Sequence, residues 1–309
     1  MNTMLAFAPL CTGKEIVIMA QAQIGVIGGS GLYQMDQFND IEEVAIDTPF
    51  GSPSDKFVIG TLAGKRVAFL PRHGRGHRFS PTEINYRANI FAFKKLGVDW
   101  LIAGSACGSF KEELSPGTIV IIDQLFDRTR ARNENVTFFE NGIVAHVPFG
   151  EPFSAPLMDV VYSAAKSAGV KVVKGGTYVN MEGPAFSTKA ESFFYKNQGF
   201  DVIGMTNYFE ARLAREAEIN FATMALVTDY DCWHEGHDDV DVEMVIRTMK
   251  ENAQSFRDIV IKTVETIPDE VPQDINTNAL KFAILTNPEH ITDDAKNRLQ
   301  PIIGKYFNK

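Results

Sequence analysis

Short apolar runs recur along the chain, and most are rich in Val, Ile and Ala and bounded by polar residues or glycine. Runs of this kind are typical of buried strands. The pattern predicts strands over residues 24–27, 67–70, 100–103, 119–122, 170–173, 202–205 and 221–227. A strand pattern also runs through Tyr178 and Val179. Helical patterns lie between several of these runs. The alternation favours an α/β fold, a single domain with a mixed, mostly parallel twisted sheet flanked by helices.

Two capping boxes predict where helices begin. Ser80-Pro81-Thr82-Glu83 also has proline at the first helical position, and it predicts a helix that runs to Leu96 and stops at Gly97. Thr188-Lys189-Ala190-Glu191 predicts a second helix. Residues 240–267 repeat Val, Met, Ile and Phe at helical spacing, so we expect a long helix packed on the sheet.

The ends of the chain differ in character from its middle. We expect a disordered N-terminal extension over residues 1–22, because Met19 directly precedes the first strand pattern and could be the true translation start. The globular domain is predicted over residues 23–267. Residues 268–309 open with two prolines and several acids, which predicts a loop followed by short helices packed on the domain.

Composition narrows the class of partner. Thirty basic and 39 acidic residues give a net charge of −9, so nucleic acid and anionic membranes would be repelled. No apolar run approaches the roughly 20 residues that span a bilayer. A small molecule is the expected ligand. The cysteines, Cys11, Cys107 and Cys232, are odd in number and form no CxxC spacing, which favours a reducing, cytoplasmic setting.

The most informative segment is Thr228-Asp229-Tyr230-Asp231-Cys232-Trp233, which follows the apolar run 221–227. Ligands of open α/β sheets bind beyond the carboxyl ends of the strands. On a continuing strand Asp229 and Asp231 would point the same way, and their repulsion would keep one partly protonated. A proton donor beside an acceptor suits an amino-substituted heterocycle. The alternative is a turn with two solvated aspartates.

Three further segments could bind an anion. Gly28-Gly29-Ser30-Gly31 follows a strand pattern and could cradle a phosphate or merely form a tight turn, and its spacing is not that of a dinucleotide site. Arg72-His73-Gly74-Arg75-Gly76-His77 offers arginine and histidine donors to an oxyanion. No carboxylate cluster accompanies the histidines, so we expect no metal. Gly104 to Ser109 is read as a third polar strand end.

Several motifs occur in one order from about Ile24 to Ile267, and together they resemble S-methyl-5′-thioadenosine phosphorylases. The motifs are Gly28-Gly29-Ser30-Gly31, Thr48-Pro49-Phe50-Gly51, Arg72-His73-Gly74-Arg75, Asn85-Tyr86-Arg87-Ala88-Asn89, Glu182-Gly183-Pro184, Met205-Thr206 and the segment 228–233. The resemblance implies the trimeric class of the purine nucleoside phosphorylase fold. It also implies a pentosyltransferase of methionine and purine salvage that converts S-methyl-5′-thioadenosine and phosphate into adenine and 5-methylthioribose 1-phosphate, without a cofactor or metal.

The resemblance also assigns site residues. It implies that phosphate contacts Ser30, Arg72, His73, Ser105, Ala106 and Thr206, that the purine contacts Phe186, Ser187, Asp229 and Asp231, and that the ribose contacts Met205. It implies a 5′-methylthio pocket lined by His146, Val242 and Val245, with His146 from the neighbouring subunit of a homotrimer. Phe186 on its own could equally be a core residue. Phe209 replaces a common proline and Ala185 a common arginine, and Phe209 could alter the ribose side or the start of the following helix.

The chemistry of phosphorolysis fits two aspartates. A protonated Asp can donate to N7 of the leaving purine while an ionised Asp accepts from the 6-amino group. A 6-oxopurine offers an acceptor at that position, so adenine is favoured. The alternatives are a phosphorylase of 6-oxopurine nucleosides or methylthioinosine and, more distantly, a nucleoside-binding protein without turnover.

Overall fold

The structure is a computed structural model that describes residues 21–29, 35–132, 136–234 and 242–307, with the side chains of 242–247 and 249 left out. Within these residues, eleven strands form one sheet. The strands are β1 (Ile24–Gly28), β2 (Asn39–Val44), β3 (Phe57–Leu62), β4 (Lys65–Pro71), β5 (Trp100–Ser109), β6 (Ile119–Ile121), β7 (Gln124–Asp127), β8 (Val172–Lys174), β9 (Thr177–Asn180), β10 (Val202–Gly204) and β11 (Asn220–Asp229). The helices are α1 (Tyr86–Lys95), α2 (Ala155–Ser167), α3 (Lys189–Asn197), α4 (Asn207–Glu216), α5 (Val242–Thr266), the 3-10 turn η2 (Pro288–His290), α6 (Asp293–Arg298) and α7 (Gln300–Phe307).

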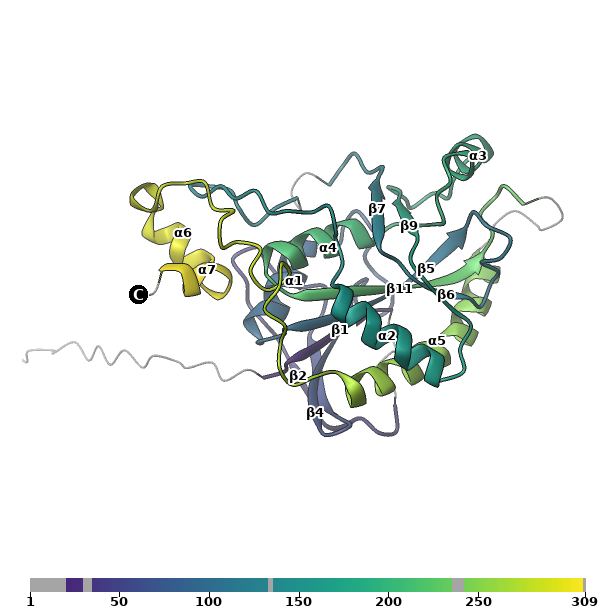
Figure 1. Ribbon diagram of the computed structural model, residues 1–309, viewed down its shortest axis with the longest axis horizontal. Coiled ribbons are helices and arrows are strands. Elements are labelled where there is room, and N and C mark those ends of the chain that lie inside the picture. The colour runs from purple at the N-terminus through teal and green to yellow at the C-terminus, as the bar shows by residue number, and fades with distance from the viewer. Residues whose placement is uncertain (1–20, 30–34, 133–135, 235–241, 308–309) are drawn as a thin grey trace, which may run out of the picture.

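The sheet is mixed, and β5 pairs with three other strands, β1, β10 and β11. Parallel pairing joins β1 to β4 and β5, β5 to β11, β6 to β8, and β9 to β7 and β10. Antiparallel pairing joins β10 to β5, β11 to β6, and β3 to β2 and β4. The predicted single α/β domain with a mixed sheet flanked by helices is therefore confirmed (Figure 1).

Opposite strand directions bring several strand ends to the middle of β5. Ile27 of β1 pairs with Ala103, so β1 ends beside Gly104. Strand β10 runs the other way, with Ile203 opposite Gly108, so its carboxyl end also approaches the middle of β5. The segment Gly104 to Ser109, predicted as a strand end, is instead the second half of a ten-residue strand. The carboxyl ends of β1 and β10 therefore both lie beside the middle of β5.

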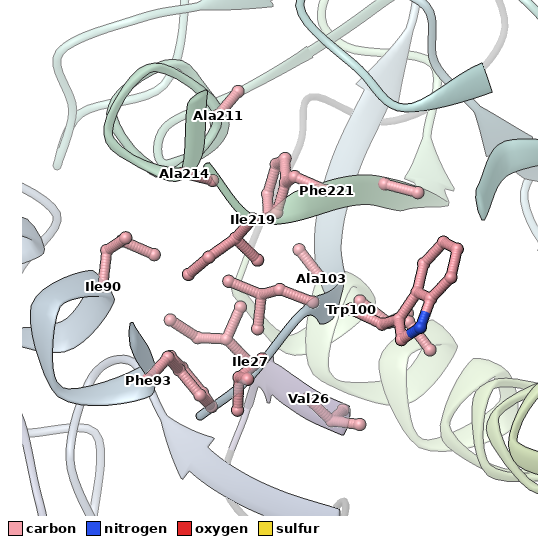
Figure 2. Packing of buried hydrophobic residues seen from close by; sticks show 14 of the residues in the cluster. Val26, Ile27, Ile90, Phe93, Trp100, Ala103, Ala211, Ala214, Ile219 and Phe221 are labelled. Carbon is pink, nitrogen blue, oxygen red and sulfur yellow. The ribbon is translucent and has the colours of Figure 1, made fainter. Parts of the chain in front are cut away.

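Helices cover both sides of the central strands (Figure 1). Helix α4 lies on one side of β11, and α2 and α5 lie on the other. Figure 2 shows Ile90 and Phe93 of α1 and Ala211 and Ala214 of α4 facing buried side chains of β1, β5 and β11. Burying each large apolar side chain contributes about 1.5–3 kcal/mol to the stability of the fold. This packing therefore holds both helices against the sheet.

The first predicted helix begins later than its capping box. The N–H and hydroxyl of Ser80 donate to Glu83 at 3.0 and 2.7 Å, but these bonds close a turn. Helix α1 begins at Tyr86, where Asn85 caps it by accepting from the Ala88 N–H. The predicted start was wrong because a Ser–Glu side-chain contact stabilises a single turn as well as a helix end. The predicted stop at Gly97 is confirmed by its positive φ of 87°.

The other two predicted helices, α3 and α5, are present. The capping box at Thr188 is present at the start of α3, with the Thr188 and Glu191 side chains bonded reciprocally. The long helix predicted over 240–267 appears as α5, and residues 240–241 lie outside the described residues.

Three strands were absent from the predictions. Strand β3 is nearly fully buried, and its Phe57-Val58-Ile59 run was a readable signal. A hairpin turn at Ala63 and Gly64, both with positive φ, joins β3 to β4. Strand β2 is almost wholly exposed and polar, and β7 is only partly buried, so neither has an apolar run.

The chain ends are partly described. Residues 1–20 of the predicted extension lie outside the described residues, whereas Ala22 is already buried and its N–H donates to the Leu96 carbonyl at 3.2 Å. Ala22 thus packs against the end of α1. In the C-terminal segment Leu299, Ile302 and Ile303 join the main core. Among the described residues, no helix has the length and apolar character needed to cross a membrane.

Candidate active site

Arg72 lies directly after β4 and is almost completely buried. Its Nε and Nη2 donate to the two carboxylate oxygens of buried Glu210 at 2.6 and 2.9 Å, and Nη1 donates to the Gly104 carbonyl at 2.5 Å. A weaker bond of 3.5 Å joins Nη2 to the Ile27 carbonyl. These contacts tie the ends of β1 and β4 to β5 and α4, and within the described part of the chain they leave one Nη1 N–H without a bond.

His73 is neutral in this setting. Its Nδ1 lies 2.8 Å from the Phe79 carbonyl, which can only accept, so Nδ1 carries the proton and Nε2 presents a lone pair. Burial, with a further contribution from the positive charge of Arg72, lowers the pKa of His73 to about 4. The His77 ring stacks on the His73 ring with centroids 4.1 Å apart, which holds the imidazole in place.

Two hydroxyl side chains complete this group. Ser105 Oγ on β5 lies 3.4 Å from Thr206 Oγ1 and 3.4 Å from the buried Tyr178 hydroxyl. Thr206 is the N-cap residue of α4, yet its hydroxyl makes no capping bond, so it is available to a ligand. The positive end of the helix dipole lies at the same place. Arg72, Ser105 and Thr206 therefore gather at the middle of β5, where Ala106 also lies, and His73 directly follows Arg72. Ser30 lies outside the described residues.

Asp229 and Asp231 lie side by side, but not as alternate residues of one strand. Strand β11 ends at Asp229, and Asp231 has a left-handed φ of 53° in the turn that follows. The turn lets the Asp231 N–H donate to Asp229 Oδ1 at 2.8 Å, while the Thr228 hydroxyl donates to Oδ2 at 2.7 Å. The expectation that both residues lie on one continuing strand was wrong, although the two residues are still in contact.

Glycine at position 108 makes room for the pair. A Cβ at Gly108 would lie 2.8 Å from Asp229 Oδ1 and 3.2 Å from the Asp231 Cβ, so a larger residue would push the carboxylates off β5. Both aspartates are buried. Burial raises the pKa of Asp229 to about 6, and repulsion from Asp231 adds the smallest share. Desolvation, rather than the expected mutual repulsion, is the main reason that a proton is retained here.

Asp231 has a different environment from its neighbour. Burial also raises its pKa above the ordinary value. Its Oδ2 is buried and has no hydrogen-bond partner within the described part of the chain. A buried acceptor without a donor is costly, and a ligand N–H would satisfy it.

The loop after β9 closes over the aspartates. The Cys232 thiol donates to the Ser187 carbonyl at 3.3 Å, which places Phe186 and Ser187 beside the Asp231 turn. Phe186 is 43% exposed, so it is not a core residue and its ring can stack on a flat ligand. Gly183 lies against the Met205 side chain, because a Cβ there would be 2.4 Å from its sulfur. Phe186 and Ser187 thus adjoin the Asp231 turn, and Met205 adjoins the start of the same loop at Gly183.

Of the residues predicted to line the methylthio pocket, only His146 has a described side chain. His146 is exposed, and its N–H donates to the Ala283 carbonyl at 2.9 Å. Figure 1 shows the C-terminal helices at the end of the molecule opposite α3, whose preceding loop carries Phe186. Val242 and Val245 fall in the first turn of α5, where side chains lie outside the described residues.

The two departures from the family pattern have separate outcomes. Phe209 is only 2% exposed, and its ring centroid lies 5.4 Å from both the Tyr86 and Tyr208 rings. It fills the core beneath the site instead of facing a ligand, and α4 still begins at Asn207. An effect of Phe209 on the ribose side or on the start of α4 stays a prediction. Ala185 is exposed in the loop beside Phe186.

Glu210 and Tyr178 were not predicted as site residues. A glutamate inside an amphipathic helix gives no sign that it fixes an arginine 138 positions away. Within the described ranges, no three His, Cys, Asp or Glu side chains gather as a metal ion would require.

The comparisons with known proteins agree with this geometry. The family model described as Phosphorylase superfamily matches residues 23–265. An S-methyl-5′-thioadenosine phosphorylase of Geobacter sulfurreducens is 54% identical over 92% of this chain and 98% of its own length, and one of Koribacter versatilis is 53% identical over 94% and 98%. The chain therefore belongs to the phosphorylase superfamily and, within it, to the family of S-methyl-5′-thioadenosine phosphorylases.

Solved structures carry the same likeness. A methylthioadenosine phosphorylase from an antarctic soil metagenomic library has a TM-score of 0.86 and 44% identity, covering 92% of this chain and 99% of its own. A Schistosoma mansoni methylthioadenosine phosphorylase in complex with adenine has a TM-score of 0.78 and 35% identity, covering 84% and 96%.

Proposed function

We propose that this protein catalyses the phosphorolysis of S-methyl-5′-thioadenosine to adenine and 5-methylthioribose 1-phosphate, with inorganic phosphate as co-substrate and no cofactor or metal. The observation that carries the proposal is the buried aspartate pair beside a group of anion-binding side chains. The names of relatives at 44–54% identity over nearly the whole chain support the same substrate.

Asp229 and Asp231 would act on the departing purine. Cleavage of an N-glycosidic bond passes through an oxocarbenium-like state, so the leaving base gains negative charge and needs a proton. Asp229, with a pKa of about 6, can carry that proton to N7 at near-neutral pH. Asp231 Oδ2, which lacks a donor in the described residues, would accept from the 6-amino group.

The anion-binding group would hold phosphate beneath the anomeric carbon. Arg72 is fixed by Glu210 and keeps one N–H for the ligand. Nε2 of neutral His73 would accept a hydrogen bond from the hydroxyl of a protonated phosphate and so share its proton. The hydroxyls of Ser105 and Thr206 and the backbone at Ala106 and Ser30 would bind the remaining oxygens, and the α4 dipole favours the anion.

The same pair disfavours a 6-oxopurine, which would be the substrate of the alternative phosphorylase. An oxygen at C6 would face the Asp231 carboxylate without a proton between them. A buried acceptor left unpaired costs about 1–3 kcal/mol, or roughly tenfold to a hundredfold in kcat/KM.

We also propose a cytoplasmic homotrimer. The His146 N–H donates to Ala283 in the C-terminal segment, and Figure 1 shows the helices of that segment at the end of the molecule opposite α3. This arrangement supports a neighbouring subunit as the source of His146 for each 5′-methylthio pocket. Val242 and Val245 would line the same pocket. Neither described cysteine, Cys107 or Cys232, is in a disulfide, which fits a reducing compartment.

One assay tests the reaction. Purified protein is incubated with S-methyl-5′-thioadenosine with and without phosphate, and adenine and the sugar phosphate are measured. The proposal expects adenine only with phosphate or its analogue arsenate. Equal adenine release without phosphate would indicate hydrolysis, and tight binding without any release would indicate a nucleoside-binding protein. Sedimentation of the active protein as a monomer would exclude the trimer.

A further inference from the structure

The guanidinium of Arg132 makes five hydrogen bonds within the protein. Its side chain is 0% exposed. Its Nε donates to Glu182 Oε1 at 3.0 Å, and Nη1 donates to the Met205 carbonyl at 2.6 Å and to the Tyr86 hydroxyl at 3.1 Å. Its Nη2 donates to the carbonyl of Glu182 at 2.5 Å and, more weakly, to that of Met181 at 3.4 Å. All five N–H groups of the guanidinium are used.

The partners of Arg132 belong to separate segments of the site. The Met205 carbonyl follows β10, and the Glu182 carbonyl follows β9 and directly precedes Gly183, which lies against the Met205 side chain. Arg132 itself follows β7. These strands are neighbours in the sheet, so one side chain joins the loops at their three carboxyl ends.

Glu182 holds Arg132 from the opposite side. Its Oε2 accepts from the N–H groups of Arg130 and Ala131 at 2.5 and 3.0 Å, and its Oε1 also accepts from the Thr82 hydroxyl at 2.9 Å. Burial would raise the pKa of Glu182, but these donors and Arg132 lower it to about 2. The carboxylate is thus ionised, and the pair fixes the backbone of 130–132 against that of 181–182.

The two groups of site residues differ in their relation to Arg132. Met205, whose carbonyl Arg132 binds, and the loop of Phe186 and Ser187, which continues from Glu182, carry the proposed nucleoside contacts. Arg72 and His73, which face the phosphate, are fixed by Glu210, Gly104 and Phe79 and make no described bond to Arg132.

From this arrangement we propose that Arg132 is a positioning residue for the nucleoside: it sets the distance between the ribose contact at Met205 and the purine loop that begins at Glu182. The proposal rests on the proposed phosphorolysis. Lysine cannot replace it, because an ammonium has three donors and no planar fork, and it would leave at least two of the five acceptors unpaired.

Kinetics with varied nucleoside and varied phosphate test the proposal. Arg132→Lys is expected to raise the KM for S-methyl-5′-thioadenosine about tenfold or more, while the KM for phosphate changes by less than about twofold. Glu182→Gln, at a side chain that is 28% exposed, is the second variant, because it loosens Arg132 without removing it. It is expected to raise the same KM several-fold. Adenine affinity measured by calorimetry with phosphate present should fall in both variants.

Arg66→Lys is the matched control. Arg66 lies near the amino end of β4, and its guanidinium also contacts two carbonyls, of Gln21 and Asp40, and one carboxylate, of Glu42. This variant should leave both KM values unchanged, and its melting temperature shows the cost of such an exchange away from the site.

The outcomes separate the two proposals. A wild-type protein that releases no adenine with phosphate rejects the reaction itself. If the wild type is active but Arg132→Lys and Glu182→Gln leave the nucleoside KM and adenine affinity within twofold, or raise both KM values equally, Arg132 has a structural role only. Should Arg132→Lys fail to fold, the result with Glu182→Gln decides.

Discussion

The proposed reaction requires that Asp229 is protonated, and Asp229→Asn tests this requirement. Asparagine has nearly the same shape and can still donate a hydrogen bond to N7, but it cannot transfer a proton. Its side chain also removes the charge that burial disfavours, so the fold should be retained. The variant thus separates proton transfer from binding.

The pKa of Asp229 gives the expected size and sign. Burial raises this pKa from 3.8 to about 6, so the protonated form dominates below pH 6. About a tenth of the protein remains protonated at pH 7 and about a hundredth at pH 8. With phosphate saturating, kcat/KM for the nucleoside should therefore fall about tenfold per pH unit above 6. Asp229→Asn should lower kcat by about 10² to 10⁴ and should remove this decline.

The assay is the initial rate of adenine release between pH 5.5 and 8.5 for the wild type and the variant. Asp159→Asn is the control, because Asp159 is an exposed residue of α2 paired with Lys174, and its profile should match the wild type. The reasoning is refuted if Asp229→Asn keeps the declining profile of the wild type, or if its kcat stays within a few-fold. Either result would leave Asp231 or solvent as the proton donor.

Three other substitutions have distinct expected effects. Asp231→Asn places an amide donor opposite C6, so the preference for methylthioadenosine over methylthioinosine in kcat/KM should narrow about tenfold or more; an unchanged ratio would remove Asp231 from base recognition. Arg72→Lys keeps a charge beside Glu210 but loses the free N–H, so the phosphate KM should rise about tenfold, and no rise would place phosphate elsewhere. Glu216 is buried on α4, and burial raises its pKa from 4.5 to about 7. The stability that comes from its protonated form is full below pH 4.5 and is lost as the pH rises through 7. Glu216→Gln should therefore gain up to about 3 kcal/mol over the wild type by pH 8 and almost nothing near pH 4.5, as measured by denaturant unfolding at both pH values.

Local signals in the sequence predicted those parts of the fold that are set locally. The apolar runs that became β1, β4 and β11 are buried on both faces, so their composition alone distinguishes them. The capping box at Thr188 and the stop at Gly97 likewise depend on a few adjacent residues. Strand β2 has no such signal, because an exposed edge strand is held by its pairing with β3.

Contacts that join distant segments were out of reach of the same reasoning. The bond between Arg72 and Glu210, and the five bonds of Arg132, depend on which strands are neighbours in the sheet. Arg132 follows a short, half-exposed strand that was not predicted, so nothing marked it as a residue beside the site. Glu210 differs from the solvent-facing acids of other helices only in the direction of its side chain.

The sequence predicted that Asp229 and Asp231 lie together, but it predicted the wrong backbone geometry for Asp231. Strand β11 delivers Asp229 to the sheet edge whatever follows it, because the apolar run 220–227 is buried beside β5. The position of Asp231 depends instead on a left-handed turn and on the absence of a side chain at Gly108, two features that no spacing rule contains. Burial by that turn, more than repulsion between the two acids, raises the pKa of Asp229. A substitution that reopens the turn to water should therefore lower this pKa and weaken the acid even with both carboxylates in place.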